Sequence, residues 1–244
     1  MIIEQLFPEV ANLYGDSFNV RLLALSRPAA TVIETKLGDT PAFALRDDID
    51  LVYLGSMTEN GQRQVMGALA PYRERLVALA QAGKRFLFTG NALDLVGERV
   101  TNPDMGYEFA GLGLFPFTTM LRMYQRINDK VLCVGDGEPV VGFKSTFSHR
   151  TPLATAASAN WSWAKVVRGL GLATGLDEGA RLGGLTASDI LGPLLPLNPP
   201  YAKALLADLG AGDAPLVHEQ ALTRAYGARL AEFRDPRCWE SGGH

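Results

Sequence analysis

Residues that build metal sites and disulfide frameworks are scarce in this chain of 244 residues. It has two cysteines, Cys133 and Cys238, which lie far apart and form no Cys-x-x-Cys pattern, and three dispersed histidines, His149, His218 and His244. Zinc sites and disulfide scaffolds need such residues at short, regular spacings. The sequence therefore predicts no metal site, no disulfide framework and no resident cofactor.

Long apolar runs and clustered basic charge are also missing. The most apolar stretch, residues 65–82, is interrupted by Arg73, Glu74 and Arg75. It therefore lacks the uninterrupted apolar run that a helix needs to cross a bilayer. Lysine and arginine are scattered singly, and the formal net charge of -3 provides no basic surface for phosphates. The first residues do not form a secretory signal. We therefore expect a cytoplasmic protein that neither inserts into membranes nor binds nucleic acid.

In the first half of the chain, the hydrophobic pattern alternates between strands and a helix. Short runs rich in Val, Ile, Leu and Phe at residues 31–35, 50–55 and 84–90 predict buried strands. Residues 61–82 carry apolar side chains at spacings of three and four, which predicts one amphipathic helix. Strand, helix and strand with short connections form the crossover unit of a parallel sheet, and functional loops follow the strands of such sheets.

The second half of the chain is predicted to add antiparallel strands and then helices. The pattern favours strands at 121–127, 130–134 and 140–144, a hairpin turn at Asp136-Gly137, and helices at 201–209 and 215–233. No linker divides the chain. We expect a single domain over residues 1–236 and a tail over residues 237–244.

One turn has the form of a nucleophile elbow. Gly55 and Gly90 each mark the end of a predicted strand, and residues 88–97 lead from a strand into a short helix. In α/β enzymes, a nucleophile on such a turn is surrounded by helix-end N–H groups that stabilise an oxyanion. Glycine tolerates the positive φ of the turn but supplies no reactive atom. Asn91 is predicted to cap the helix, with Asp94 three residues later as in a capping box.

Three segments of the chain match, in the same order, motifs of one known family. Residues 90–97 are similar to a Cys-Gly-Gly-Tyr-Gln-Leu-Leu-Gly elbow, residues 13–20 to a Leu-Tyr-Gly-Asp-x-x-Asn opening, and residues 192–199 to a Gly-Pro-Leu-Leu-Pro-x-Asn-Pro run. The chain thus resembles class I glutamine amidotransferases of the cobyric-acid-synthase type, most closely the glutaminase subunit of lipid II isoglutaminyl synthase. This resemblance implies a three-layer, flavodoxin-like α/β fold with a mostly parallel sheet and added antiparallel strands.

The residues that carry catalysis in that family are replaced in this chain. The resemblance puts Gly90 at the position of the nucleophilic cysteine and Leu191 at the position of the catalytic histidine. The family's glycine-rich oxyanion loop is similar to Gly55-Ser56-Met57, and its Gly-Phe-Glu-Asn-His motif is matched only at Gly142-Phe143. Glutamine hydrolysis needs a thiolate to attack the amide and an imidazole to move the proton. We therefore expect negligible hydrolysis by the family's route.

Other polar side chains are candidates for the pocket, and each also has an ordinary structural role to consider. Thr89 and Ser56 flank Gly90, but neither has a visible base, and strand alternation points Thr89 away from the direction of the nucleophile. Cys133 lies within a predicted strand and is expected to be an inert buried thiol. Arg122 is of the residue type that holds a substrate carboxylate, although surface salt bridges are the commoner role. The pocket candidates are Gly55, Ser56, Thr89, Gly90, Asn91, Arg122 and Leu191, and none is catalytic by the family's route.

Two further groups are expected at the surface. His149 is an isolated histidine beside Arg150, which is more typical of a surface residue than of a catalytic base. Asp177 and Glu178 are adjacent in a glycine-rich stretch over residues 161–184, and neighbouring carboxylates in such loops are usually solvated.

Three functions remain open from the sequence. The first is a non-catalytic amidotransferase-like subunit that pairs with a Mur-ligase-like synthetase in peptidoglycan precursor amidation, as the resemblance implies. The second is an active glutaminase or amide hydrolase with a replaced nucleophile. The third is a module that uses the pocket to bind glutamine, another amino acid or a peptidoglycan precursor.

Overall fold

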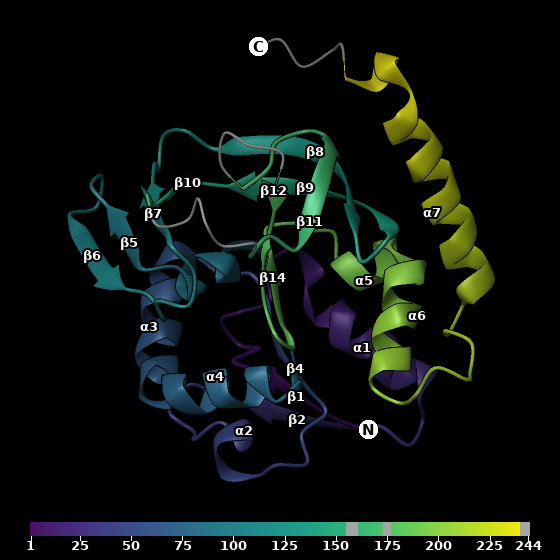
Figure 1. Cartoon of the computed structure of the whole chain (residues 1–244), viewed down its shortest axis with the longest axis horizontal. Coiled ribbons are helices and arrows are strands. Elements are labelled where there is room, and N and C mark those ends of the chain that lie inside the picture. Colours follow the sequence, from purple (N-terminus) through teal and green to yellow (C-terminus); the bar gives the residue numbers. More distant parts are fainter. Residues whose placement is uncertain (155–160, 173–176, 240–244) are drawn as a thin grey trace.

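A six-stranded sheet forms the centre of the computed structural model, which describes residues 1–154, 161–172 and 177–239 (Figure 1). Its strands, in spatial order, are β13 (Ala180–Leu182), β14 (Leu185–Ser188), β4 (Arg85–Thr89), β3 (Leu51–Leu54), β1 (Ile2–Leu6) and β2 (Thr31–Thr35). All pairs are parallel except β13 with β14 at one edge. This mostly parallel sheet with added antiparallel strands confirms the predicted α/β fold.

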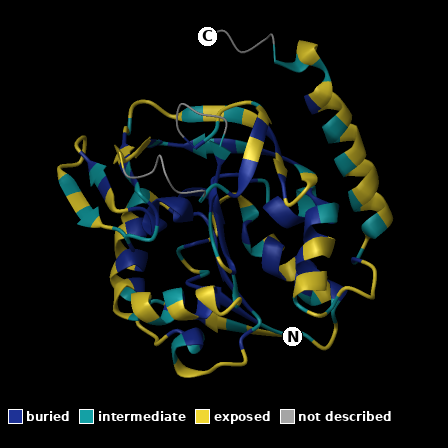
Figure 2. Ribbon diagram, in the orientation of Figure 1, coloured by how far each residue is buried: buried dark blue, intermediate teal, exposed yellow. Residues whose placement is uncertain are grey.

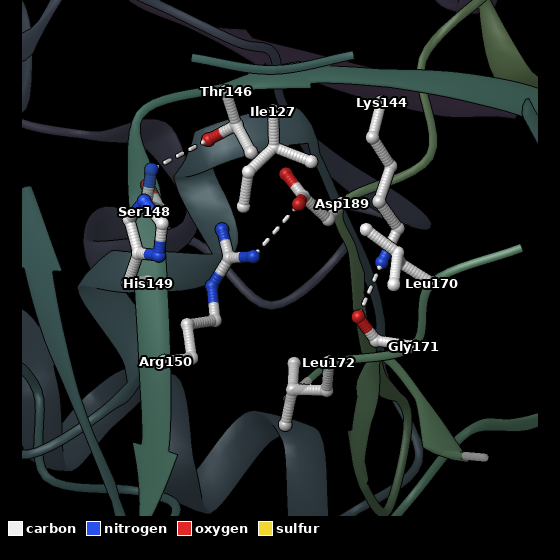
Figure 3. Close-up of a pocket in the computed structure, with 10 residues that line it drawn as sticks. All are labelled: Ile127, Lys144, Thr146, Ser148, His149, Arg150, Leu170, Gly171, Leu172 and Asp189. Atoms are coloured by element: carbon white, nitrogen blue, oxygen red, sulfur yellow. Dashed lines mark hydrogen bonds and ion pairs between the residues drawn. The ribbon is translucent and has the colours of Figure 1, made fainter. Parts of the chain in front are cut away.

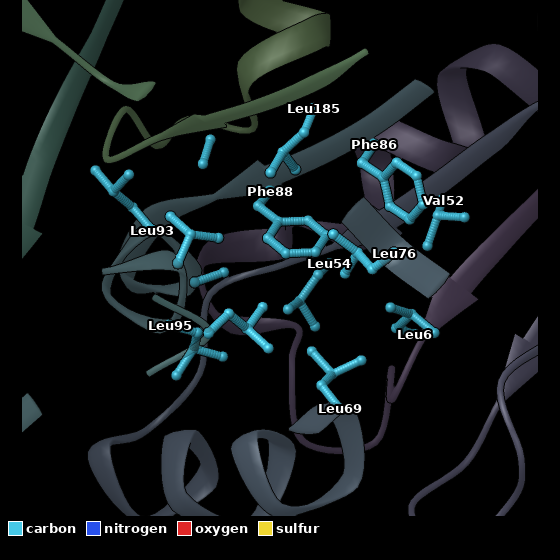
Figure 4. Close-up of a cluster of buried hydrophobic side chains, with 14 of the residues drawn as sticks. Leu6, Val52, Leu54, Leu69, Leu76, Phe86, Phe88, Leu93, Leu95 and Leu185 are labelled. Atoms are coloured by element: carbon cyan, nitrogen blue, oxygen red, sulfur yellow. The ribbon is translucent and has the colours of Figure 1, made fainter. Parts of the chain in front are cut away.

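Helices cover both faces of the sheet, because side chains of each strand alternate between two cores (Figure 1). Along β3, Leu51 and Tyr53 face one core, whereas Val52 and Leu54 face the other. The first core is closed by α1 (Ser17–Ser26), α5 (Leu194–Leu197) and α6 (Pro199–Asp208), and the second by α2 (Ala42–Leu45), α3 (Glu59–Leu69) and α4 (Arg73–Gln81). Figure 4 shows the second core, where Phe86 and Phe88 of β4 lie among leucines from the helices and neighbouring strands.

Two smaller sheets are added to the central one. The first contains β5 (Arg99–Asn102), β6 (Tyr107–Ala110), β7 (Phe117–Leu121) and β10 (Ser148–Pro152), and the second contains β8 (Ile127–Gly135), β9 (Glu138–Thr146), β11 (Ala164–Arg168) and β12 (Asp177–Glu178). The last helix, α7 (Glu219–Arg234), packs Phe233 against Leu132 and Val141 of the second sheet. Most of its remaining surface is exposed (Figure 2).

The helix predicted over residues 61–82 is wrong as a single element. It is divided into α3 and α4 by a 3-10 turn, Ala70–Tyr72, which contains Pro71. Proline has no backbone N–H to continue the helical hydrogen bonds, and its ring clashes with the carbonyl four residues earlier. The helix also starts earlier than predicted, at Glu59, because the Thr58 side chain accepts a hydrogen bond from the Gly61 N–H at 3.1 Å.

The predicted hairpin at Asp136-Gly137 is confirmed, and both residues have positive φ angles, of 55° and 83°. The strand predicted over residues 121–127 is wrong, because β7 ends at Leu121 and a turn precedes β8. Helix α6 begins two residues earlier than predicted and α7 four residues later. Residues 173–176 of the glycine-rich stretch, and residues 240–244 of the predicted tail with His244, lie outside the described residues.

Candidate functional site

The elbow predicted around Gly90 is present as a tight turn at the carboxyl end of β4. The chain leaves the strand at Thr89 and enters a 3-10 helix, Gly90–Val96, with Gly90 at a φ of +61°. A Cβ atom on Gly90 would lie 2.5 Å from the Ser56 Cβ and 2.7 Å from the Leu191 Cδ2. Real carbon contacts are never so short. Ser56 and Leu191 therefore fill the space into which a side chain at this position would project.

Leu191 is held opposite the elbow by backbone pairing with β9. Its N–H donates to the Phe143 carbonyl at 2.9 Å, and the Phe143 N–H donates to the Leu191 carbonyl at 3.3 Å. The two segments can approach because the neighbouring Gly142 has no side chain; a Cβ there would lie 2.7 Å from the Leu191 carbonyl oxygen. The Asn198 side chain pairs with the N–H and the carbonyl of Val141, both at 2.8 Å. The motifs at residues 142–143 and 192–199 thus act together to position Leu191.

The opening motif supplies Asp16, which joins the ends of two strands. Its Oδ2 atom accepts hydrogen bonds from the Ser56 N–H at 2.6 Å and from the Thr89 hydroxyl at 3.0 Å. Gly55 is required beside it, since a Cβ there would lie 2.5 Å from the Ala11 carbonyl oxygen. Burial raises the pKa of Asp16, and the hydrogen bonds from Ser56 and Thr89 offset part of that rise.

The prediction that Asn91 caps the elbow helix is wrong. Its side chain accepts from the Met57 N–H at 2.9 Å and donates to the Met57 carbonyl at 2.7 Å. The residue preceding the helix is Thr89, which makes no side-chain cap. The 3-10 helix begins at Gly90, so Asn91 lies within it and not before it. The Asn91 side chain joins the elbow to the loop after β3.

The elbow cavity is a space of about 110 Å³ beside the elbow, and Gly90 itself does not line it, because Ser56 and Leu191 lie between. Its lining includes Tyr14, Ser56, Asn91, Arg126 and Leu191. Pockets that bury drug-sized molecules usually have about 300–1,000 Å³, so this cavity is too small for a ligand of that size.

Of the seven pocket candidates, Ser56, Asn91 and Leu191 line the elbow cavity, whereas Gly55, Thr89, Gly90 and Arg122 do not. Thr89 is fully buried, and its hydroxyl lies 2.7 Å from that of Tyr53, in the direction that strand alternation predicts. Arg122 is exposed in the turn after β7, which the hydrogen bond from Gln125 N–H to the Arg122 carbonyl closes at 2.9 Å. That turn brings Arg126 to the cavity in place of Arg122, with its guanidinium 4.6 Å from the centre of the Phe147 ring.

Comparison with known proteins gives a likeness at the level of fold. No family model matches the sequence, and no curated protein matches it. Among solved structures, "Structure of PurLQS from Thermotoga maritima" has a TM-score of 0.51 at 14% identity, over 94% of this chain and 98% of that one. "Crystal structure of glutamine amidotransferase" has a TM-score of 0.53 at 12% identity, over 85% of this chain and 98% of that one. The chain has a glutamine amidotransferase-like fold.

Within this amidotransferase-like fold, the structure contains a buried charge cluster that the sequence reasoning missed. The Arg150 Nε donates to Asp94 Oδ1, and its Nη1 to Asp189 Oδ2, both at 2.7 Å. Lys144 pairs with Glu178 at 2.5 Å. All five side chains are at most 2% exposed. Burial lowers the pKa of Arg150, but the adjacent Asp189 and Asp94 outweigh this and raise it, so Arg150 stays charged.

Two sequence-based expectations are corrected by this cluster. Glu178 was expected to be solvated, but it is fully buried, because β12 pairs with β11 and brings it to Lys144. Asp94 was expected to belong to a capping box; instead it accepts from Arg150, from Ser148 and from Gln62. Polar residues at every second position, 144, 146, 148 and 150, all face inward, and this period of two was a signal for a buried polar strand face.

Two other groups considered for catalysis, Cys133 and His149, do not line the elbow cavity. Cys133 is fully buried in β8, and burial raises the pKa of its thiol well above the ordinary value, with the Glu178 charge adding to the rise. His149 is half-buried, with its Nε2 atom 3.3 Å from the Gln125 carbonyl oxygen.

Over residues 1–154, 161–172 and 177–239, there is no cluster of metal-binding side chains, and no helix is long and apolar enough to span a membrane.

Proposed function

We propose that the chain is a catalytically silent amidotransferase-like subunit. The single observation that carries this proposal is the contact between Gly90 and Leu191 at the elbow, where a Cβ at position 90 would lie 2.7 Å from the leucine. The position that bears a nucleophile in the resembled family has no side chain, and an aliphatic group stands beside it. Removing the nucleophile of such a catalytic unit typically lowers the rate by a factor of about a million.

The neighbouring hydroxyl groups support a silent site, because each is engaged elsewhere. The Ser56 hydroxyl donates to the Leu13 carbonyl at 3.0 Å, so its proton is not directed at a base. The Thr89 hydroxyl has a carboxylate partner in Asp16, but Thr89 is fully buried and cannot meet a substrate. A nucleophile needs both a base within hydrogen-bond reach and access to the substrate. Neither hydroxyl meets both conditions.

The partner in this proposal is a Mur-ligase-like synthetase, and the process is amidation of peptidoglycan precursors. Both come from the resemblance of residues 13–20 and 192–199 to the isoglutaminyl synthase subunit. The exposed side chains of Leu13, Tyr14 and Phe18, at 38, 40 and 52%, provide an apolar contact surface, and the first two also line the elbow cavity. Exposed apolar patches of this kind are typical of protein–protein contacts. The subunit's role would be to support or regulate the synthetase.

Rebuilding the active site tests the silent-site proposal. We expect Gly90→Cys with Leu191→His to hydrolyse glutamine weakly, and more strongly once Ser56→Gly removes the obstructing Cβ, while Gly90→Ser with Leu191→Phe stays inactive as a matched control. The readout is ammonia release, with folding checked by circular dichroism. If the unmodified chain already released ammonia from glutamine as fast as the rebuilt one, the proposal would be wrong.

Co-purification tests the proposed partner. Tagged chain, returned to its native cell, should recover an ATP-dependent ligase of the Mur type, identified by mass spectrometry. Tyr14→Asp with Phe18→Asp should abolish recovery, whereas Leu25→Asp, at a similarly exposed position with 55% exposure, should not. A chain that stays monomeric and recovers no ligase argues against this partner and leaves the silent-site proposal intact.

A further inference from the structure

A second cavity lies beside the buried charge cluster, which the proposed function does not use. It has a volume of about 200 Å³, and we call it the Arg150 cavity. Figure 3 shows its polar wall, formed by Arg150, Asp189 and Lys144, and the apolar side chains of Ile127 and Leu172 around it. Thr146 is the one residue in both lining sets, so the Arg150 cavity and the elbow cavity are separate spaces.

Two buried charged atoms of residues that line this cavity have no hydrogen-bond partner within the described part of the chain. They are the Nη2 nitrogen of Arg150 and the Oδ1 oxygen of Asp189. Both side chains are 2% exposed. Their other atoms are joined by the hydrogen bond from Nη1 to Oδ2 at 2.7 Å, so the free donor and the free acceptor belong to one pair (Figure 3). Buried polar atoms are nearly always hydrogen-bonded, which indicates that something else satisfies these two.

The two free atoms, one a donor and one an acceptor, select the kind of molecule that fits. The guanidinium of Arg150 already pairs with Asp94 and Asp189, and the Lys144 ammonium pairs with Glu178, so neither cation is without a carboxylate partner. An anion would meet the Asp189 carboxylate, and a cation would meet the Arg150 guanidinium. Burying an uncompensated charge is costly, whereas a neutral group with one acceptor and one donor on adjacent atoms satisfies both free atoms.

We propose that the Arg150 cavity binds a small neutral molecule with a primary carboxamide on an apolar body. The carbonyl oxygen of the amide accepts a hydrogen bond from Arg150 Nη2, and the amide NH₂ donates to Asp189 Oδ1. The body packs against Ile127, Leu170 and Leu172. Entry is from the side of Leu170, which is 50% exposed and lines the cavity.

Three probes of the same shape test the proposal with the full-length chain. Benzamide is neutral, benzoate is its anionic counterpart and benzamidine its cationic one. We expect benzamide to bind about tenfold or more tightly than either ion, because each ion leaves one buried charged atom unpaired. Protein-observed NMR titration measures these affinities and reports whether the shifted signals come from residues of the cavity.

Two variants separate this site from non-specific binding. In Asp189→Asn, the side-chain oxygen still accepts from Arg150 and its NH₂ replaces the free acceptor, so the preference should reverse from benzamide to benzoate. Leu170→Trp fills the entrance and should weaken benzamide binding at least tenfold, while Leu25→Trp, at a similarly exposed leucine, should have no effect. Leu170→Trp leaves the charge cluster intact, so it remains informative if Asp189→Asn fails to fold.

Equal affinities for the three probes, or no binding of benzamide, would overturn the proposal and leave ordered water as the partner of the two atoms. Benzamide binding that survives Leu170→Trp would overturn it as well, because the molecule would then lie elsewhere. None of these results bears on the silent elbow, which is tested by glutamine hydrolysis.

Discussion

Replacing Gly90 with alanine should destabilise the chain strongly, although it adds a single methyl group. The new Cβ would lie 2.5 Å from Ser56 Cβ and 2.7 Å from Leu191 Cδ2. The first of these atoms is close to the backbone and cannot swing away, and extra methyl groups in packed interiors cost about 1–3 kcal/mol. The left-handed backbone, at a φ of +61°, costs a non-glycine residue about 1–2 kcal/mol. Together we expect the free energy of unfolding to fall by about 2–5 kcal/mol.

Two other glycines provide matched controls for this substitution. Gly106 has a φ of +68° and open space where a Cβ would be, so Gly106→Ala should show the backbone cost alone, about 1–2 kcal/mol. Gly67 lies within α3, also with open space, so Gly67→Ala should stabilise the helix by up to about 1 kcal/mol. The difference between positions 90 and 106 then measures the packing contribution at the elbow.

Chemical denaturation followed by circular dichroism measures all three variants. Adding Ser56→Gly to Gly90→Ala should recover at least about 1 kcal/mol, because it removes the closer of the two contacts. If Gly90→Ala lowered the free energy of unfolding no more than Gly106→Ala does, the space in front of the elbow would be open. The claim that Ser56 and Leu191 fill the nucleophile's position would then be refuted.

Three further predictions concern the buried polar groups. Burial raises the pKa of Asp16 above its ordinary 3.8, so the native state binds this proton more tightly than the unfolded state, and this group's contribution to stability falls as pH rises. Asp16→Asn, which mimics the protonated acid, should be more stable than wild type at pH 7 and lose that advantage towards pH 4. Lys144→Met should cost about 3–5 kcal/mol because Glu178 is left buried and unpaired, and adding Glu178→Gln should recover part of the loss. Of the two thiols, Cys238 alone should react with Ellman's reagent in the native state, because Cys133 is fully buried.

A specific result would contradict each of these three predictions. If the stability advantage of Asp16→Asn over wild type instead increased as pH falls, the native state would hold the Asp16 carboxyl in its ionised form. A Lys144→Met variant as stable as wild type would show that Glu178 is reached by water. Rapid labelling of Cys133 without unfolding would reopen the hypothesis of a replaced nucleophile.

The parallel core could be predicted because its strands are short apolar runs that end at glycine. Residues 50–55 and 84–90 carry this pattern and became β3 and β4, whereas residues 31–35 became β2, an edge strand that is mostly exposed and not buried as predicted. The interruption at Pro71 was also visible in the sequence, but the helical spacing on either side concealed it. Local pattern thus predicted the existence of elements better than their ends.

The candidate site was predicted in part, for a physical reason. Gly90, Ser56 and Leu191 come together as the motif order implied, because parallel strands bring their carboxyl ends to one edge of the sheet. The partners of Arg150 could not be predicted, since Asp94 and Asp189 lie 56 and 39 residues away and meet it only through the packing of separate sheets. Long-range ion pairs leave no local signal in the sequence.

Glutamine hydrolysis by the unmodified chain tests the silent elbow most directly. With micromolar protein and millimolar glutamine, we expect ammonia to form no faster than in buffer, with or without Ser56→Ala. Saturable ammonia release that is lost on Ser56→Ala would contradict the account, because a working nucleophile would then stand beside Gly90.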